Sequence, residues 1–189
     1  MSKMRTAIPA ILLGFFVMGF VDVVGISTSY VKADFDLPDA LASMLPMAVF
    51  LWFFVFSIPT GMLMNKWGKK QVVAASMAVT AVAMVIPMVS YSFATMMVSF
   101  AMLGIGNTML QVSLNPLAAS TVRQEMQASI LTWGQFIKAI SSFLGPILAG
   151  AAALYTGQWR MIFAIYAAVT LISLIYVWFS ANGDKEPVE

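Results

Sequence analysis

The sequence predicts an all-helical membrane protein whose chain crosses the bilayer six times. Of its 189 residues, 61% are hydrophobic and only 10% are charged, whereas about a quarter of the residues of a soluble domain are charged. Charged residues divide the chain into apolar runs of roughly the 20 residues that a helix needs to cross the hydrocarbon core. These runs do not alternate between apolar and polar residues, which argues against the strands of a membrane β-barrel.

Charged clusters and one long charge-free stretch set the expected helix boundaries. The first apolar run is longer than the roughly 7–15 residues of a signal-peptide core, so we expect it to stay in the membrane. No residue from Gln71 to Val122 is charged, and this stretch is too long for one span, so a turn is expected near residues 87–93. The expected helices are residues 6–31, 40–65, 71–89, 93–119, 128–154 and 161–180. They form one domain over residues 1–182, and residues 183–189 form a polar tail.

The basic residues predict the orientation, because Lys and Arg collect on the cytoplasmic side of a membrane. With the N-terminus inside, this side holds seven of the ten: Lys3, Arg5, Lys66, Lys69, Lys70, Arg123 and Lys185. The outer side holds Lys32 and Arg160, and Lys138 lies within the fifth helix. With six spans, both termini are expected in the cytoplasm. We expect the protein to lie in a plasma membrane, namely the inner membrane of a bacterium.

The composition argues against several kinds of chemistry. The chain contains no Cys and no His, which removes disulfides, thiol nucleophiles and imidazole acid–base catalysis. We expect no metal and no cofactor, and the sequence shows no nucleophile–base pair, so an enzyme is not expected. The net charge of +2 gives no reason to expect nucleic acid as a partner. The expected partner is the lipid bilayer.

Two ionisable residues lie deep within predicted helices: Asp22 in the first and Lys138 in the fifth. A charge at the centre of a bilayer costs about 2.5–3.5 kcal/mol, so such residues usually face a cavity or a partner. Both helices start on the same side, and at about 1.5 Å per residue the two Cα atoms differ in depth by less than ~10 Å. We expect them to pair or to share a wet cavity. Alternatively, Asp22 is protonated and Lys138 snorkels, both as structural elements.

Large polar side chains recur at helical spacing on two helices, so each set shares one face. The fourth helix carries Gly104, Asn107, Thr108, Gln111 and Asn115, and the fifth carries Gln135, Lys138, Ser142 and Gly145. We expect Asn107, Gln111, Asn115, Gln135 and Lys138 to belong to a binding site. Small residues and hydroxyls on these faces could instead serve helix packing. Pro116 and Gly145-Pro146 could kink their helices or act as hinges.

The stretch from Gly61 to Lys70 resembles the loop motif of the major facilitator superfamily, G-x-L-x-D-R/K-x-G-R/K-R/K. The matching residues are Gly61, Leu63, Lys66, Gly68, Lys69 and Lys70, and Asn65 stands where the family has Asp. Trp159-Arg160 with Phe163 resembles the start of the family's sixth helix. Gly145-Pro146 with Gly150 resembles its glycine–proline pattern in the fifth. The resemblance implies half of the family fold, built as two inverted three-helix repeats.

Within that superfamily, the fourth helix resembles the branch of fucose and glucose/galactose permeases. The residues that carry this resemblance are Gly104-x-Gly106-Asn107, Gln111 and Asn115-Pro116. That branch has an acidic residue at the position of Gln111 and another in the first helix. Gln111 cannot carry a proton, and Asp22 lies about one turn before the family's acid if Phe15-Phe16 is aligned. These two departures concern the family's route of proton coupling. The resemblance to this branch implies a sugar-like solute.

Family members have twelve helices in two six-helix halves, whereas this chain has six. We expect a half-length symporter that pairs with a second copy of itself, as a homodimer, or with a separate six-helix half. Alternatives are a non-transporting subunit and an N-terminal fragment of a twelve-helix transporter. The resemblance implies alternating access to a small polar solute. Asp22 would sense a proton or charge, Lys138 would be its partner or a substrate contact, and the amides would donate and accept hydrogen bonds. Basic residues of the loop motif would dock onto helix C-termini or acids.

Overall fold

A computed structural model describes residues 2–180 of the protein, and their side chains from residue 7 onward. Eight α-helices and two short 3-10 helices make up the described part, in which there is no β-strand. The α-helices are α1 (Ser2–Met18), α2 (Val23–Asp34), α3 (Asp39–Ala42), α4 (Met44–Trp67), α5 (Lys69–Val89), α6 (Phe93–Thr121), α7 (Gln127–Thr156) and α8 (Met161–Phe179). The 3-10 helices are η1 (Gly19–Asp22) and η2 (Gln124–Met126). The predicted tail at residues 183–189 lies outside the described residues.

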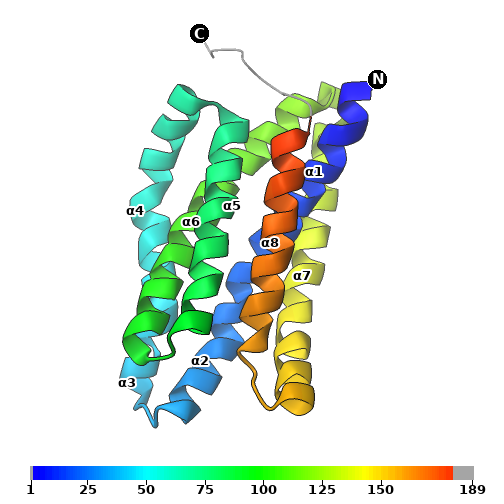
Figure 1. The fold of residues 1–189 in the computed structure, drawn as a ribbon. Helices are drawn as coiled ribbons and strands as arrows, with labels where there is room; N and C mark the ends of the chain where they lie inside the picture. The colour runs from blue at the N-terminus through cyan, green and yellow to red at the C-terminus, as the bar shows by residue number, and fades with distance from the viewer. Residues whose placement is uncertain (1, 181–189) are drawn as a thin grey trace.

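Six helical segments are long and apolar enough to cross a membrane, which confirms the predicted fold class. They are Ala7–Asp34, Asp39–Trp67, Lys69–Val89, Phe93–Thr121, Gln124–Thr156 and Met161–Phe179. Because an odd number of crossings reverses direction, the second set of three spans starts at the opposite end of the bundle from the first. The start of α1 and the end of α8 lie at the same end (Figure 1).

The first span is interrupted, which the sequence did not predict. The 3-10 helix η1 joins α1 to α2 in the middle of the span, and its last residue is Asp22. Two contacts hold η1 in place. A Cβ on Gly19 would lie 2.6 Å from the carbonyl oxygen of Lys138, so the backbones of η1 and α7 are nearly in contact. On the other side, the ring of Phe20 stacks on that of Tyr166 in α8, with 3.8 Å between centroids.

The predicted kinks near Pro116 and Pro146 do not break their helices. Each of these prolines lies inside a continuous α-helix, α6 and α7 respectively. The one interruption of a span by a 3-10 helix contains no proline. Proline removes a single backbone hydrogen bond, which neighbouring helices and local adjustments can accommodate in a membrane protein.

The two edge helices of the bundle are the least buried. In Figure 1, α4 and α7 lie at the left and right edges, and α5 and α8 stand between them. In the most apolar stretch of α4 and of α7, 22% of the residues are buried, against 56% in α5 and in α6. Large apolar side chains cover the open surfaces of both helices. They include Phe50, Phe54, Ile58 and Met62 on α4, and Trp133, Phe136, Phe143 and Ile147 on α7.

An aromatic cluster joins three segments at the end of the bundle opposite α1's first turn. The carboxylate of Asp34, at the end of α2, accepts hydrogen bonds from the Tyr91 hydroxyl and from Trp159 Nε1 (2.9 Å). Tyr30 stacks on Trp159, and the guanidinium of Arg160 lies 4.2 Å from the centre of the Tyr91 ring. Burial and the nearby Asp34 raise the pKa of Tyr91 above its usual range. The cluster therefore ties α2 to the α5–α6 and α7–α8 loops.

The core depends on close helix contacts at small residues, as expected where lipid removes the hydrophobic drive for association. A Cβ on Gly104 of α6 would lie 2.5 Å from the carbonyl oxygen and 2.9 Å from Cα of Val49 in α4. These atoms belong to the backbone and cannot rotate away. Gly104 thus sets how closely α6 and α4 approach.

Replacing Gly104 by Ala should push α4 away from α6 and lower the free energy of unfolding by about 1–3 kcal/mol, the usual cost of overpacking. Unfolding can be followed by SDS titration in mixed micelles. The matched control is Gly150→Ala in α7, where no atom lies within 4 Å of the new Cβ and Ala favours the helix by up to about 1 kcal/mol. Equal effects of the two substitutions would contradict the packing role.

Candidate functional site

A cavity of about 390 Å³ lies between the first span, α4, α6 and α7. Three of its lining residues are polar: Asp22 of η1, Gln111 of α6 and Lys138 of α7. The others are Val21, Val24, Gly25, Pro46, Val49, Phe50 and Phe53. The two deep ionisable residues thus share one cavity, as expected. The volume falls within the range of pockets that hold small molecules, about 300–1,000 Å³.

Of the two predicted arrangements, a pair or a shared cavity, Asp22 and Lys138 adopt the shared cavity without an ion pair. The hydroxyl of Ser142 in α7 donates a hydrogen bond to Oδ2 of Asp22. Ser142 lies one helical turn after Lys138, and its hydroxyl is also 3.0 Å from the Lys138 carbonyl oxygen. An ion pair joins Lys32 to Asp39 near the α2–α3 connection, but none joins Asp22 to Lys138. The partner of Asp22 is therefore the hydroxyl group of Ser142 and not the ammonium group of Lys138.

The remaining predicted site residues do not line this cavity. Asn107 is 2% exposed and its Nδ2 has no hydrogen-bond partner; Oδ1 of Asn115 is likewise buried and unpartnered. Gln135 is exposed on α7. The structure thus brings together Asp22, Gln111 and Lys138, and leaves the other three candidates outside. A buried polar atom without a hydrogen-bond partner costs about 1–3 kcal/mol. The unpartnered Nδ2 of Asn107 and Oδ1 of Asn115 therefore destabilise this conformation.

The apolar wall of the cavity was not predicted from the sequence. Pro46, Val49, Phe50 and Phe53 of α4 line it, and their spacing is that of one helix face. Because α4 is apolar on all sides, that spacing does not stand out in the sequence. The sequence places Ser142 on the polar face of the fifth helix, but it does not predict the hydrogen bond from Ser142 to Asp22.

The described residues contain no group of three or more His, Cys, Asp or Glu side chains that could hold a metal ion. The site consists of one acid, one base, one amide and an apolar wall. Such a site can bind a small polar molecule by charge and hydrogen bonds.

Comparison with known proteins gives the family. The sequence model described as "Major Facilitator Superfamily" matches residues 10–189. The chain belongs to the major facilitator superfamily. Two curated proteins similar to it are each named "Glucose/galactose transporter", from Brucella abortus biovar 1 (strain 9-941) and Brucella abortus (strain 2308). Each is 27% identical over 152 residues, which cover 78% of this chain and 37% of the relative. The chain therefore matches less than two fifths of each relative's length.

The loop motif of this superfamily member forms the tight connection between α4 and α5. Gly68 has φ 90°, a backbone conformation that favours glycine, and it both ends α4 and precedes α5. Asn65, where the family has Asp, and its neighbour Lys66 are exposed. Gly61 and Leu63 lie in the last turns of α4 before it, and Lys69 begins α5.

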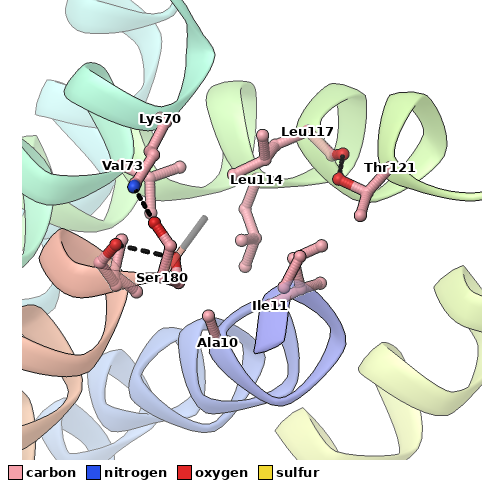
Figure 2. Close-up of a pocket in the computed structure, with 10 residues that line it drawn as sticks. Ala10, Ile11, Lys70, Val73, Leu114, Leu117, Thr121 and Ser180 are labelled. Carbon is pink, nitrogen blue, oxygen red and sulfur yellow. Dashed lines mark hydrogen bonds between the residues drawn. The ribbon is translucent and has the colours of Figure 1, made fainter. Parts of the chain in front are cut away.

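Lys70, the last residue of the motif, reaches the C-terminus of α8. Its ammonium donates a hydrogen bond to the carbonyl oxygen of Ser180 (Figure 2). It donates a second one to the carbonyl oxygen of Trp178 (3.3 Å). The last carbonyl groups of a helix have no partner within it and carry partial negative charge, so a lysine is a suitable cap. The prediction that a basic residue of the motif docks onto a helix C-terminus is confirmed for Lys70.

Beside this contact lies a second, much smaller pocket between α1, α5, α6 and α8 (Figure 2). Its volume is about 20 Å³, space for about one water molecule. Its wall is largely apolar and includes Ala10, Ile11, Leu114 and Leu117. This pocket is too small for a solute. Two hollows of about 410 Å³ each lie between α5 and α8, and no charged residue lines either of them. The cavity around Asp22 is the candidate site because it combines a sufficient volume with an acid and a base.

Double-mutant cycles should separate the two possible partners of Asp22. The cycle of Asp22→Asn with Ser142→Ala should give a coupling of about 0.5–1.5 kcal/mol in the free energy of unfolding, the worth of one hydrogen bond. The cycle of Asp22→Asn with Lys138→Gln should give less than about 0.5 kcal/mol. A larger coupling to Lys138 than to Ser142 would show that an ion pair forms in the membrane.

Lys70→Met should remove the cap of α8 and destabilise its last turn by about 0.5–1.5 kcal/mol. Amide hydrogen exchange should therefore speed up in residues 176–180. Lys66→Met makes the same change in the last turn of α4, where the side chain is exposed, and should leave exchange in α8 unchanged. Equal exchange in α8 for both variants would rule out the capping role.

Proposed function

We propose that this chain is half of a secondary active transporter for a small sugar-like solute, and that it works by alternating access after pairing with a second six-helix unit. The observation that carries the proposal is the cavity between α4 and α7, which holds Asp22, Gln111 and Lys138. Family membership supports transport rather than an enzymatic activity. The printed name of the two Brucella relatives supports a sugar-type solute.

The second unit would cover the open faces of α4 and α7. Both helices flank the cavity and carry exposed aromatic side chains. Large exposed apolar surface alone fits lipid equally well, but Asp22 is exposed within the cavity, so the cavity lacks a wall on one side and a second unit could supply it. The halves of a major facilitator are related by an axis along the membrane normal. A second copy of this chain would insert in the same direction and satisfies that geometry.

Each polar residue of the site has a proposed role. Asp22 takes up a proton or senses charge, Lys138 contacts the solute, and Gln111 exchanges hydrogen bonds with hydroxyl groups. Asn107, Asn115 and Gln135 are proposed as further hydrogen-bonding contacts in another conformation. The unpartnered amide atoms of Asn107 and Asn115 support this role, because a movement of α6 that gave them partners would be favourable.

The membrane placement forms part of the proposal. We propose a bacterial inner membrane with both termini in the cytoplasm. The strong excess of Lys and Arg on one side supports this orientation. The α4–α5 loop with Lys70 then lies on the cytoplasmic side, and the cluster of Asp34, Tyr91 and Trp159 lies outside.

A second candidate is a non-transporting membrane subunit, or the N-terminal part of a twelve-helix transporter. The observation that favours it is that the match covers 37% of the length of each relative. This candidate predicts a monomer in detergent and no uptake by the chain alone. Mass measurement of the purified protein and cross-linking in membranes distinguish the two.

Proteoliposomes that contain this chain alone should take up labelled galactose in a saturable way, faster with an inward proton gradient. Asp22→Asn should remove the dependence on the gradient, because an amide cannot carry the proton. The matched control is Asp36→Asn, which makes the same change at an exposed loop residue with φ 49°, a conformation that Asn adopts readily. It should retain the dependence. No uptake by a correctly inserted monomer would exclude autonomous transport.

A further inference from the structure

Asp22 and Lys138 line the same cavity without pairing, and this has a consequence for the solute. The Asp22 carboxylate is held by the Ser142 hydroxyl. The backbone contact between Gly19 and the carbonyl oxygen of Lys138 keeps η1 against this turn of α7. No ion pair or hydrogen bond involves the Lys138 ammonium among the described residues.

We infer that the solute carries one negative charge, a carboxylate on a small polyhydroxylated molecule, and that Lys138 receives it. This inference rests on the proposed transport function. The polar part of the cavity then has one place for each part of such a solute: Lys138 for the carboxylate and Gln111 for hydroxyl groups. Charge-assisted hydrogen bonds of this kind are roughly twice as strong as neutral ones.

The charges of the cavity favour this solute over a neutral sugar. With Asp22 ionised and Lys138 protonated, the empty cavity has no net charge. A bound monoanion makes it −1, and one proton on Asp22 restores zero. A neutral sugar with one proton would instead leave +1. Net charge in the middle of a membrane is costly. For uptake coupled to one proton, the loaded site is therefore as neutral as the empty one when the solute is a monoanion.

Few other groups can take part in this exchange of charge. The titratable side chains near Asp22 are Lys138 of α7 and Tyr166 of α8, the latter in contact with Phe20 of η1. The cavity-lining residues from α4 and α6 are Pro46, Val49, Phe50, Phe53 and Gln111, none of which titrates. Asp22 is therefore the group in the lining that can release a proton when the anion leaves.

The test compares binding of galactose and galacturonate, which differ in the oxidation of one terminal carbon, to the purified full chain in lipid nanodiscs. Equilibrium dialysis of labelled sugars should show galacturonate bound at least about tenfold more tightly than galactose, the effect of one hydrogen bond to a charged group. Binding of galacturonate should strengthen as the pH falls, for as long as galacturonate stays ionised, because the bound anion and a proton on Asp22 together leave the site neutral.

Variants assign the effect to Lys138. Lys138→Gln should bring the two affinities within about threefold, and Lys138→Arg should restore the preference. Arg123→Gln is the matched control, since it removes a positive charge from an exposed loop away from the cavity, and it should keep the preference. Asp22→Asn should keep the preference and abolish its pH dependence. Thermal unfolding of each variant shows that it is folded.

The outcomes separate this inference from the proposed function. Galactose that binds as tightly as galacturonate, or more tightly, overturns the anionic solute and leaves sugar transport standing. A preference for galacturonate that survives in Lys138→Gln also overturns the inference, because another group must then receive the carboxylate. If neither sugar binds, both the inference and the proposal of a sugar-like solute fail.

Discussion

The contact between η1 and α7 positions every charged group of the candidate site. Gly19 has no side chain, so its backbone lies against the turn of α7 that runs from Lys138 to Ser142. This contact places Asp22 within hydrogen-bond reach of Ser142 and on the same cavity as Lys138. On the opposite side, Phe20 is held against Tyr166. A short 3-10 segment is thereby held between two helices, and its last residue faces the cavity.

The same device recurs at other close contacts between spans. Gly104 meets the backbone of Val49, and Gly134 of α7 lies against the ring of Phe15, where a Cβ would come within 2.3 Å of a ring carbon. In a bilayer, lipid tails are as apolar as leucine, so contact area and close approach replace the hydrophobic effect between helices. The glycines of this chain that could be mistaken for a binding motif, Gly104 and Gly106, are packing residues of this kind.

The number of spans was predictable, but the partners within the site were not. Apolar length and charge positions suffice for six helices, because every backbone polar group in the membrane must be satisfied within a helix. Depth along a helix axis placed Asp22 and Lys138 at a similar level. It could not tell which side chain on α7 meets Asp22, because that depends on how each helix is rotated. For the same reason, the polar face of α6 divides: Gln111 lines the cavity, whereas Asn107 is buried. The η1 break was not predictable, because its residues Gly19–Asp22 include no proline and Asp22 indicated a charge within the span rather than an interruption of the helix.

A second unit would change the site mainly by lowering the effective dielectric constant around its charges, and not by adding reactive groups. In the six-helix unit, Asp22 is exposed in a cavity lined by the first span, α4, α6 and α7, so water reduces the cost of each charge there. The interaction between two unit charges grows as the effective dielectric constant falls from that of water, about 80, to about 20 near a protein surface. Closing the open side would therefore strengthen every electrostatic preference of Asp22 and Lys138 without moving either residue. The six helices of one chain hold the charges in position, and the selectivity that those charges imply would become strong only when a second unit excludes water from them.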